Sequence, residues 1–203
     1  MKKLLCAILA CTLCLSLVGC DSGLASGNPK DVITSMLNNY KNQNFDALNK
    51  YFDGKVTFTD DLTMHGQLDA ADKAMAKLFV DRLTDIDFEV LNETVDESGN
   101  NSVVTIQITT HNVGEKLLEG VKAAVPLALN LAFSGKSETE IKKELFTALL
   151  APVQNTTKTN VKTVDINLVQ KGNEWKISSN NFAFINSITG GFMDITNQLN
   201  FLN

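Results

Sequence analysis

Residues 164–177 read Val-Asp-Ile-Asn-Leu-Val-Gln-Lys-Gly-Asn-Glu-Trp-Lys-Ile, and this stretch decides the fold. Apolar and polar side chains alternate over Val164–Leu168, and Trp175 and Ile177 resume the alternation after the turn residues Lys171–Glu174. A period of two residues is typical of a strand with one buried face, and Gly-Asn between two such runs is typical of a tight turn. The stretch therefore predicts a β-hairpin.

The same alternation occurs earlier in the chain. Apolar residues alternate with acidic ones over Ile86–Val90 and with threonine and glutamine over Val104–Thr109, on either side of the polar segment Glu97–Asn101. This pattern predicts another hairpin with one buried face. Because each hairpin has an apolar face to bury, we expect the two to share one antiparallel sheet.

Three amphipathic segments precede the predicted sheet. Asn28 stands before a proline, and Asp31 adds a negative charge to the following turn, which together indicate the start of a helix. Apolar residues at helical spacing extend this helix over Pro29 to about Lys41. A shorter helix is expected over Phe45–Phe52 and a third over about Ala70–Leu83. We expect these helices to lie against the sheet.

Two further helices are predicted between the hairpins. The helical period returns over Val113–Phe133, where Pro126 is expected to kink the helix. Ser137–Glu140 has the pattern of a capping box that starts the second helix, and Pro152 is expected to end it. The apolar stretch Ala123–Phe133 is interpreted as core, although it could also form the wall of a ligand pocket. The face of the first helix that we expect to be buried comprises Leu117, Val121, Ala124, Val125, Ala128 and Ala132.

An apolar stripe closes the chain. Apolar residues recur at steps of three and four from Ile185 to Leu202, and Gly190-Gly191 interrupts them. This spacing predicts a last helix with a flexible point at the glycine pair. The pair lacks the lysine of a phosphate-binding loop and the third glycine of a dinucleotide fingerprint, so nucleotide binding is disfavoured.

The first twenty residues have the pattern of an export signal. Two lysines precede an uncharged, mainly apolar run, which is shorter than the roughly 20 apolar residues that a membrane-spanning helix needs. The run ends in Leu17-Val18-Gly19-Cys20, which resembles the lipobox of bacterial lipoprotein precursors. The resemblance implies cleavage before Cys20 and a diacylglyceryl group on its thiol. We therefore expect residues 1–19 to be a signal peptide and residues 20–28 a lipidated, flexible tether on the extracytoplasmic face of a cell membrane.

Helices followed by two antiparallel hairpins predict an α+β fold. We expect a curved antiparallel sheet packed against the N-terminal helices, with a helical insertion between the two hairpins, in a single domain over residues 29–203. The element order and the segment Val169–Ile177 resemble the nuclear transport factor 2-like, or cystatin-like, fold. That resemblance implies a cone-shaped cavity, which the additional helices over Val113–Pro152 would fill or cap.

The composition excludes several classes of function. Removing residues 1–19 takes two of the 18 lysine and arginine residues and none of the 23 acidic residues, which leaves a net charge of −7. Nucleic acid is therefore disfavoured as a partner. Three of the four cysteines lie in the leader, so the exported domain has no internal disulfide. The two histidines, His65 and His111, lack the spacing of a metal site, and neither a metal nor a cofactor is expected.

Few residues indicate catalysis. The histidines have no neighbouring pattern of a Ser-His-Asp arrangement. The acidic pairs Asp60-Asp61 and Asp85 with Asp87 lack the spacing of a calcium loop and are interpreted as solvated charges. The fold resemblance implies one alternative, because some relatives are isomerases that stabilise an enolate with a tyrosine and aspartates. The two tyrosines, Tyr40 and Tyr51, are interpreted instead as core residues with their hydroxyl groups at the rim.

The leading hypothesis is an envelope-anchored, non-catalytic binding module for a small apolar ligand or an envelope protein. One alternative is a small isomerase or hydrolase that uses an acid in a cavity. Another is a structural or assembly role in which the stripe from Ile185 to Leu202 docks a partner helix. Four methionines that could line an apolar pocket are interpreted as packed core, namely Met36, Met64, Met75 and Met193.

Replacing Cys20 by serine tests the lipid anchor. We expect Cys20→Ser to abolish the acyl mass on the protein from its native host, because the thiol is the group that carries the lipid. Intact-mass spectrometry measures the change, and Cys14→Ser, which lies inside the leader, is the matched control that should keep the modification. A wild-type protein with a free thiol at position 20 would contradict the prediction.

Overall fold

A computed structural model of the 203-residue chain describes residues 27–54 and 70–195. The proposed signal peptide, Cys20 and most of the tether lie outside these described residues. So do His65, Met64 and the acidic pair Asp60-Asp61. The last eight positions of the chain, 196–203, which include the end of the predicted C-terminal stripe, are likewise not described.

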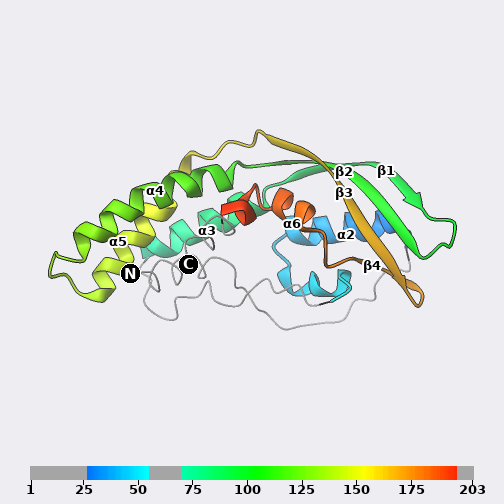
Figure 1. Cartoon of the computed structure of the whole chain (residues 1–203), viewed down its shortest axis with the longest axis horizontal. Helices are drawn as coiled ribbons and strands as arrows, with labels where there is room; N and C mark the ends of the chain where they lie inside the picture. Colours follow the sequence, from blue (N-terminus) through cyan, green and yellow to red (C-terminus); the bar gives the residue numbers. More distant parts are fainter. Residues whose placement is uncertain (1–26, 55–69, 196–203) are drawn as a thin grey trace.

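Both predicted hairpins form, and they join in one sheet. The strand order is β1-β2-β3-β4, and each neighbouring pair is antiparallel. The sheet is open and helices pack against it, so the α+β prediction is confirmed (Figure 1). The strands are β1 (Asp87–Val95), β2 (Asn101–Thr110), β3 (Asn160–Lys171) and β4 (Glu174–Ile177).

The register of the sheet places the apolar residues on one face. Ile106 in β2 pairs with Val90 in β1 and with Val164 in β3, and the alternate residues Val104 and Ile108 share its face. Val104, Ile106 and Ile108 are fully buried. The two-residue turn before β4 uses Gly172 with a φ of 61°, a conformation that glycine adopts without a steric penalty.

The helices confirm most of the predicted boundaries. Asn28 caps the N-terminus of α2 (Pro29–Lys41), and its side chain accepts a hydrogen bond of 2.9 Å from the Asp31 amide. The insertion contains α4 (Val113–Leu131), which runs through Pro126, and α5 (Glu138–Leu150), which starts with the predicted capping box at Ser137. The remaining helices are α3 (Ala70–Thr84), the 3₁₀ helix η3 (Ala151–Asn155) and α6 (Phe182–Ile188).

The single short helix predicted over Phe45–Phe52 is wrong. The segment instead forms two 3₁₀ turns, η1 (Phe45–Ala47) and η2 (Asn49–Tyr51). The last residue of the segment, Phe52, forms a β-bridge with Ile177 of β4. The Asp53 amide donates a hydrogen bond of 2.8 Å to the Ile177 carbonyl. An extended backbone at this bridge is incompatible with a continuous α-helix.

The elements group at two ends of an elongated molecule (Figure 1). We call the sheet with α2, α6, η1 and η2 the sheet body, and α3, α4, α5 and η3 the helical arm. Each part has its own apolar cluster. The insertion therefore does not lie over the inner face of the sheet, and it extends away from one end of it instead.

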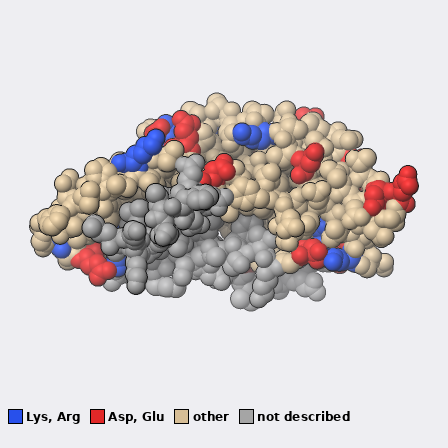
Figure 2. Space-filling model, in the orientation of Figure 1, with Lys and Arg blue, Asp and Glu red and all other residues tan. Residues whose placement is uncertain are grey.

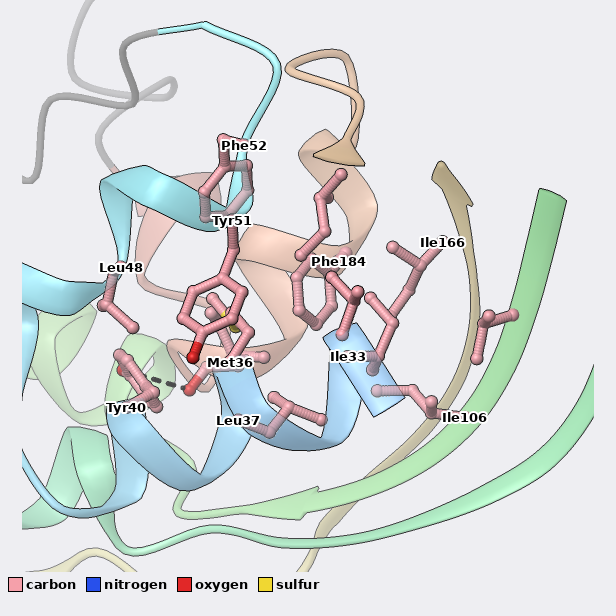
Figure 3. Packing of buried hydrophobic residues seen from close by; sticks show 14 of the residues in the cluster. Ile33, Met36, Leu37, Tyr40, Leu48, Tyr51, Phe52, Ile106, Ile166 and Phe184 are labelled. Atoms are coloured by element: carbon pink, nitrogen blue, oxygen red, sulfur yellow. Dashed lines mark hydrogen bonds between the residues drawn. The ribbon is translucent and has the colours of Figure 1, made fainter. Parts of the chain in front are cut away.

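The inner face of the sheet is occupied by the protein's own side chains. Figure 3 shows residues of α2, the 3₁₀ turns and α6 packed against Ile106 and Ile166 of the sheet. Met36 lies in this core, as predicted for it. The fully buried members from the helices are Ile33, Met36, Leu37, Leu48, Phe184 and Ile188.

The last predicted helix is divided. α6 ends at Ile188, where the Gly190 and Gly191 amides donate hydrogen bonds to the Ser187 and Asn186 carbonyls. Both glycines have positive φ, the common geometry of a glycine helix end. The prediction of one helix through a flexible glycine pair is therefore wrong. The pair ends α6 and redirects the chain toward the arm, where Phe192 is buried.

Gly120 tests how closely α4 and α5 approach. A Cβ atom on Gly120 would lie 2.0 Å from the carbonyl oxygen of Leu149, so Gly120→Ala forces the two helices apart. We expect Gly120→Ala to lower the free energy of unfolding by about 1–3 kcal/mol, as overpacking does, although alanine is ordinarily the better helix former by about 0.5–1 kcal/mol. Urea denaturation measures the change.

The control for this prediction is Gly172→Ala. No atom lies within 4 Å of a Cβ at Gly172, so only the positive φ opposes the substitution. We expect a loss of about 1 kcal/mol there. A stabilised Gly120→Ala protein would contradict the close approach of α4 and α5.

Candidate functional site

Charged side chains gather where the sheet body meets the helical arm. Asp85 and Asp87 lie where α3 leads into β1, His111 where β2 leads into α4, and Lys158 where η3 leads into β3. Lys41 at the end of α2 completes the group. We call these five residues the junction cluster. The passages from α3 to β1, from β2 to α4 and from η3 to β3 all contribute to this cluster.

The cluster is a connected network of ion pairs. The Lys158 ammonium lies 2.7 Å from one carboxylate oxygen of Asp85 and 2.8 Å from Asp87. His111 Nε2 lies 2.8 Å from the other Asp85 oxygen, and Lys41 lies 3.2 Å from Asp87. Asp85 therefore receives a donor on each carboxylate oxygen.

The network favours the charged forms of Asp85, Asp87 and Lys158. The hydrogen bonds from Lys158, and then from His111, hold the pKa of Asp85 below its usual range. Lys158 and Lys41 do the same for the pKa of Asp87. Partial burial opposes the charge on Lys158, but its hydrogen bonds to the two carboxylates outweigh this and raise its pKa.

His111 is placed for structure rather than for proton transfer. Its side chain is 6% exposed, and Nε2 is engaged with Asp85. The other ring nitrogen, Nδ1, is buried and has no hydrogen-bond partner among the described residues. A general base must reach the proton that it removes, directly or through one water. The enclosed Nδ1 has no such route to a substrate in solvent.

Backbone contacts fix the same junction. The Asn112 amide donates to the Thr157 carbonyl at 3.0 Å, and the Thr157 amide donates to the Asn112 side-chain oxygen at 2.8 Å. The Gly114 amide donates to the Gly190 carbonyl at 2.9 Å. A Cβ on Gly114 would lie 2.4 Å from the Gly191 oxygen. The arm is thus joined to the sheet body at several points in close contact.

Each tyrosine hydroxyl makes a hydrogen bond within the protein. The Tyr40 hydroxyl donates to the Leu83 carbonyl at 3.1 Å and lies 3.4 Å from the Ile188 carbonyl. Tyr40 is therefore a core residue as predicted, but its hydroxyl is bonded in the interior and not at the rim. The Tyr51 hydroxyl accepts a hydrogen bond of 2.9 Å from Asn39. Burial raises the pKa of both tyrosines.

The second candidate region is the far end of the arm. Val125, Leu129 and Phe133 recur every four residues along α4 and just beyond it, and their exposed fractions are 43%, 51% and 89%. We call these three residues the tip stripe. Single exposed apolar residues are common on protein surfaces, whereas a contiguous row indicates an interaction surface.

The opposite side of this helix end is packed. Ala124 and Leu131 of α4 form a small cluster with Leu145 of α5. The prediction that Ala123–Phe133 is core is therefore right for one side only. Val125 and Ala132, which were expected on the buried face, are exposed. α5 packs on one side of α4, and the opposite side is exposed to solvent.

The described methionines pack in the apolar clusters, as interpreted from the sequence, and do not gather around one pocket. Met36 lies in the sheet body, whereas Met75 and Met193 are half-buried against the apolar cluster of the arm. The described residues contain no group of three or more histidine, cysteine or acidic side chains that could hold a metal ion. Over the same residues, no helix is long and apolar enough to cross a membrane.

Sequence reasoning found part of both regions. It singled out Asp85, Asp87 and His111, but interpreted each as a separate solvated or turn residue. It missed Lys41 and Lys158, because no local pattern connects residues so far apart in the chain. For the tip stripe, the signal was present in the uncharged run over residues 123–135.

Comparisons with known proteins give no identification. No family model matches the chain. No curated protein matches it, and no solved structure does. The function is therefore inferred from the sequence and the geometry above.

Lys158→Met tests the junction cluster. Asp85 and Asp87 have lowered pKa values in the folded state, so their ion pairs stabilise it fully at pH values above the ordinary pKa of about 3.9. This stabilisation is lost as the pH falls through the lowered pKa values. We expect Lys158→Met to lose about 1 kcal/mol of stability at neutral pH and less in acid, since partly exposed pairs contribute little. Denaturation as a function of pH measures this.

Lys162→Met is the matched control on the same strand. Lys162 makes no ion pair with any residue in the part of the chain that the structure describes, so its removal should leave the acid dependence unchanged. High salt should also reduce the effect of Lys158→Met, because it screens exposed pairs. An equal loss of stability at all pH values would contradict the electrostatic role.

Proposed function

We propose that this chain is a lipid-anchored extracytoplasmic binding module, without catalytic activity, that makes its contact through the tip stripe. The observation that carries the proposal is the row of Val125, Leu129 and Phe133, of which Phe133 is 89% exposed. Exposing such a row to water costs free energy of about 25 cal/mol for each Å² of apolar surface, so covering it by a partner is favourable. The lipobox segment Leu17-Val18-Gly19-Cys20 supports the location.

A surface contact is better supported than an interior ligand. The side of the sheet that faces α2 is filled by residues such as Ile33, Leu37 and Phe184, all fully buried (Figure 3). A small apolar molecule would have to displace these side chains. The order of helices and hairpins supports a nuclear transport factor 2-like assignment, in which α4, α5 and η3 of the arm are an insertion between β2 and β3.

The proposal of a non-catalytic role is supported by how the reactive groups are engaged. Asp85 is bound by Lys158 and His111, and the hydroxyl of Tyr40 is bonded to backbone carbonyls. A cavity-based isomerase or hydrolase would require an acid or a tyrosine that a substrate can reach. The junction cluster instead connects the arm to the sheet body.

An assembly role for the C-terminal stripe has less support. Its described members Ile188, Phe192 and Ile195 are already buried within the domain. A partner helix would have to replace these contacts, whereas the tip stripe is accessible without any rearrangement.

Thiol protection tests the proposed contact surface. Cys20 is the only cysteine after the leader and carries the lipid in the proposal, so Leu129→Cys introduces a unique free thiol. We expect a membrane-impermeant maleimide to react poorly with this thiol in native membranes and well after detergent extraction. Val161→Cys, at an exposed residue of β3, is the control that should react in both. Equal reaction of the two thiols in membranes would refute the proposal.

A further inference from the structure

We infer that the tip stripe inserts into the interface of the lipid bilayer that also holds the anchor. The inference rests on the proposed function, because it takes the tip stripe as the contact surface and names what covers it. The occupant is a phospholipid surface, and the domain is then attached to it at two points.

The shape of the tip suits shallow insertion. Phe133 lies immediately beyond the end of α4, on the connection to α5, and is the most exposed large apolar residue described. Leu129 and Val125 follow it on the same side of the helix at four-residue steps. Apolar faces of this kind enter the boundary between headgroups and acyl chains to a depth of about 5–10 Å. The arm needs no rearrangement to present them.

The charges around the tip are compatible with a phospholipid surface. Residues 123–135 carry no charge, and Lys122 and Lys136 bracket them. Figure 2 shows this end of the molecule as an uncharged surface over the second half of α4. Lys122 can extend its ammonium group to lipid phosphates while its methylene chain lies along apolar surface, whereas Lys136 pairs with Glu144.

The acidic residues beside the tip are engaged by other side chains. Glu138 pairs with Lys142 at 2.8 Å, and Glu140 accepts hydrogen bonds from Ser137 in the capping box. Glu144 pairs with Lys136. These contacts reduce the repulsion that the acids would otherwise experience from lipid phosphates.

The size of the surface favours lipid over protein. A stable protein interface buries about 800 Å² on each partner, from roughly 20 residues or more. The tip stripe consists of three side chains, too few to form such an interface alone. A bilayer requires no matching shape, and an anchor on Cys20 would keep it permanently close to the tip.

The two attachment points lie far apart in the molecule. α2 starts toward the end that carries the hairpins, whereas the connection of α4 to α5 lies at the opposite end (Figure 1). A tether over residues 20–28 reaches at most about 30 Å from the membrane. Anchor and tip together would therefore lay the long axis of the domain along the membrane surface.

Fluorescence in vesicles tests the inference. The full lipidated protein carrying Leu129→Cys is labelled with an environment-sensitive dye and reconstituted into vesicles of phosphatidylethanolamine and phosphatidylglycerol. We expect a blue-shifted emission and quenching by lipids that carry a shallow nitroxide group. The matched control is the dye at Val161→Cys, which should show neither. Adding Val125→Ser and Phe133→Ser to the Leu129→Cys protein should abolish the quenching, and high salt should not.

The outcomes separate this inference from the proposed function. If the dye at position 129 behaves like the dye at position 161 in vesicles, the lipid surface is not the occupant. Protection of the Leu129→Cys thiol in native membranes would then indicate a protein partner at the tip and leave the proposed function intact. If the thiol is also unprotected there, both proposals fail.

Discussion

The packing of α2 against the inner face of β2 is the contact on which the rest of the structure depends. Ile33 and Leu37 from the helix and Ile106 from the strand are completely removed from water. Because α2, α6 and the 3₁₀ turns together cover the apolar face of the sheet, α4 and α5 do not also cover it. The insertion must find its own apolar partners, and it does so in the cluster that α3, α4 and α5 share.

A molecule built in two parts needs a fixed joint if the parts are to keep their relative position. The protein meets this need with charge and with close backbone contact. Lys158 forms ion pairs with both Asp85 and Asp87. His111 contacts the second carboxylate oxygen of Asp85. Gly114 and Gly190 allow the backbones to approach where any side chain would collide. The same groups therefore connect the arm to the sheet body.

This division places the proposed binding surface, the tip stripe, away from the sheet. The interior of the sheet body is filled, and the two carboxylates of the junction are paired with Lys41, His111 and Lys158. The unpartnered apolar surface lies at the end of the arm, where α5 covers only one side of α4. A rigid arm with an apolar end can make contact at a distance from the point where the tether enters the fold.

Local chemistry let the sequence alone predict both hairpins, the helices α2, α3, α4 and α5, and the caps at Asn28 and Ser137, because each depends on side chains close in the chain. Asn28 and Ser137 start the helices as predicted, and both hairpins have their predicted turns. Only the tertiary structure decided which side of α4 is exposed and that Lys158 meets Asp85. Periodicity identifies an apolar face, but what covers that face depends on contacts between residues far apart, which no local pattern encodes.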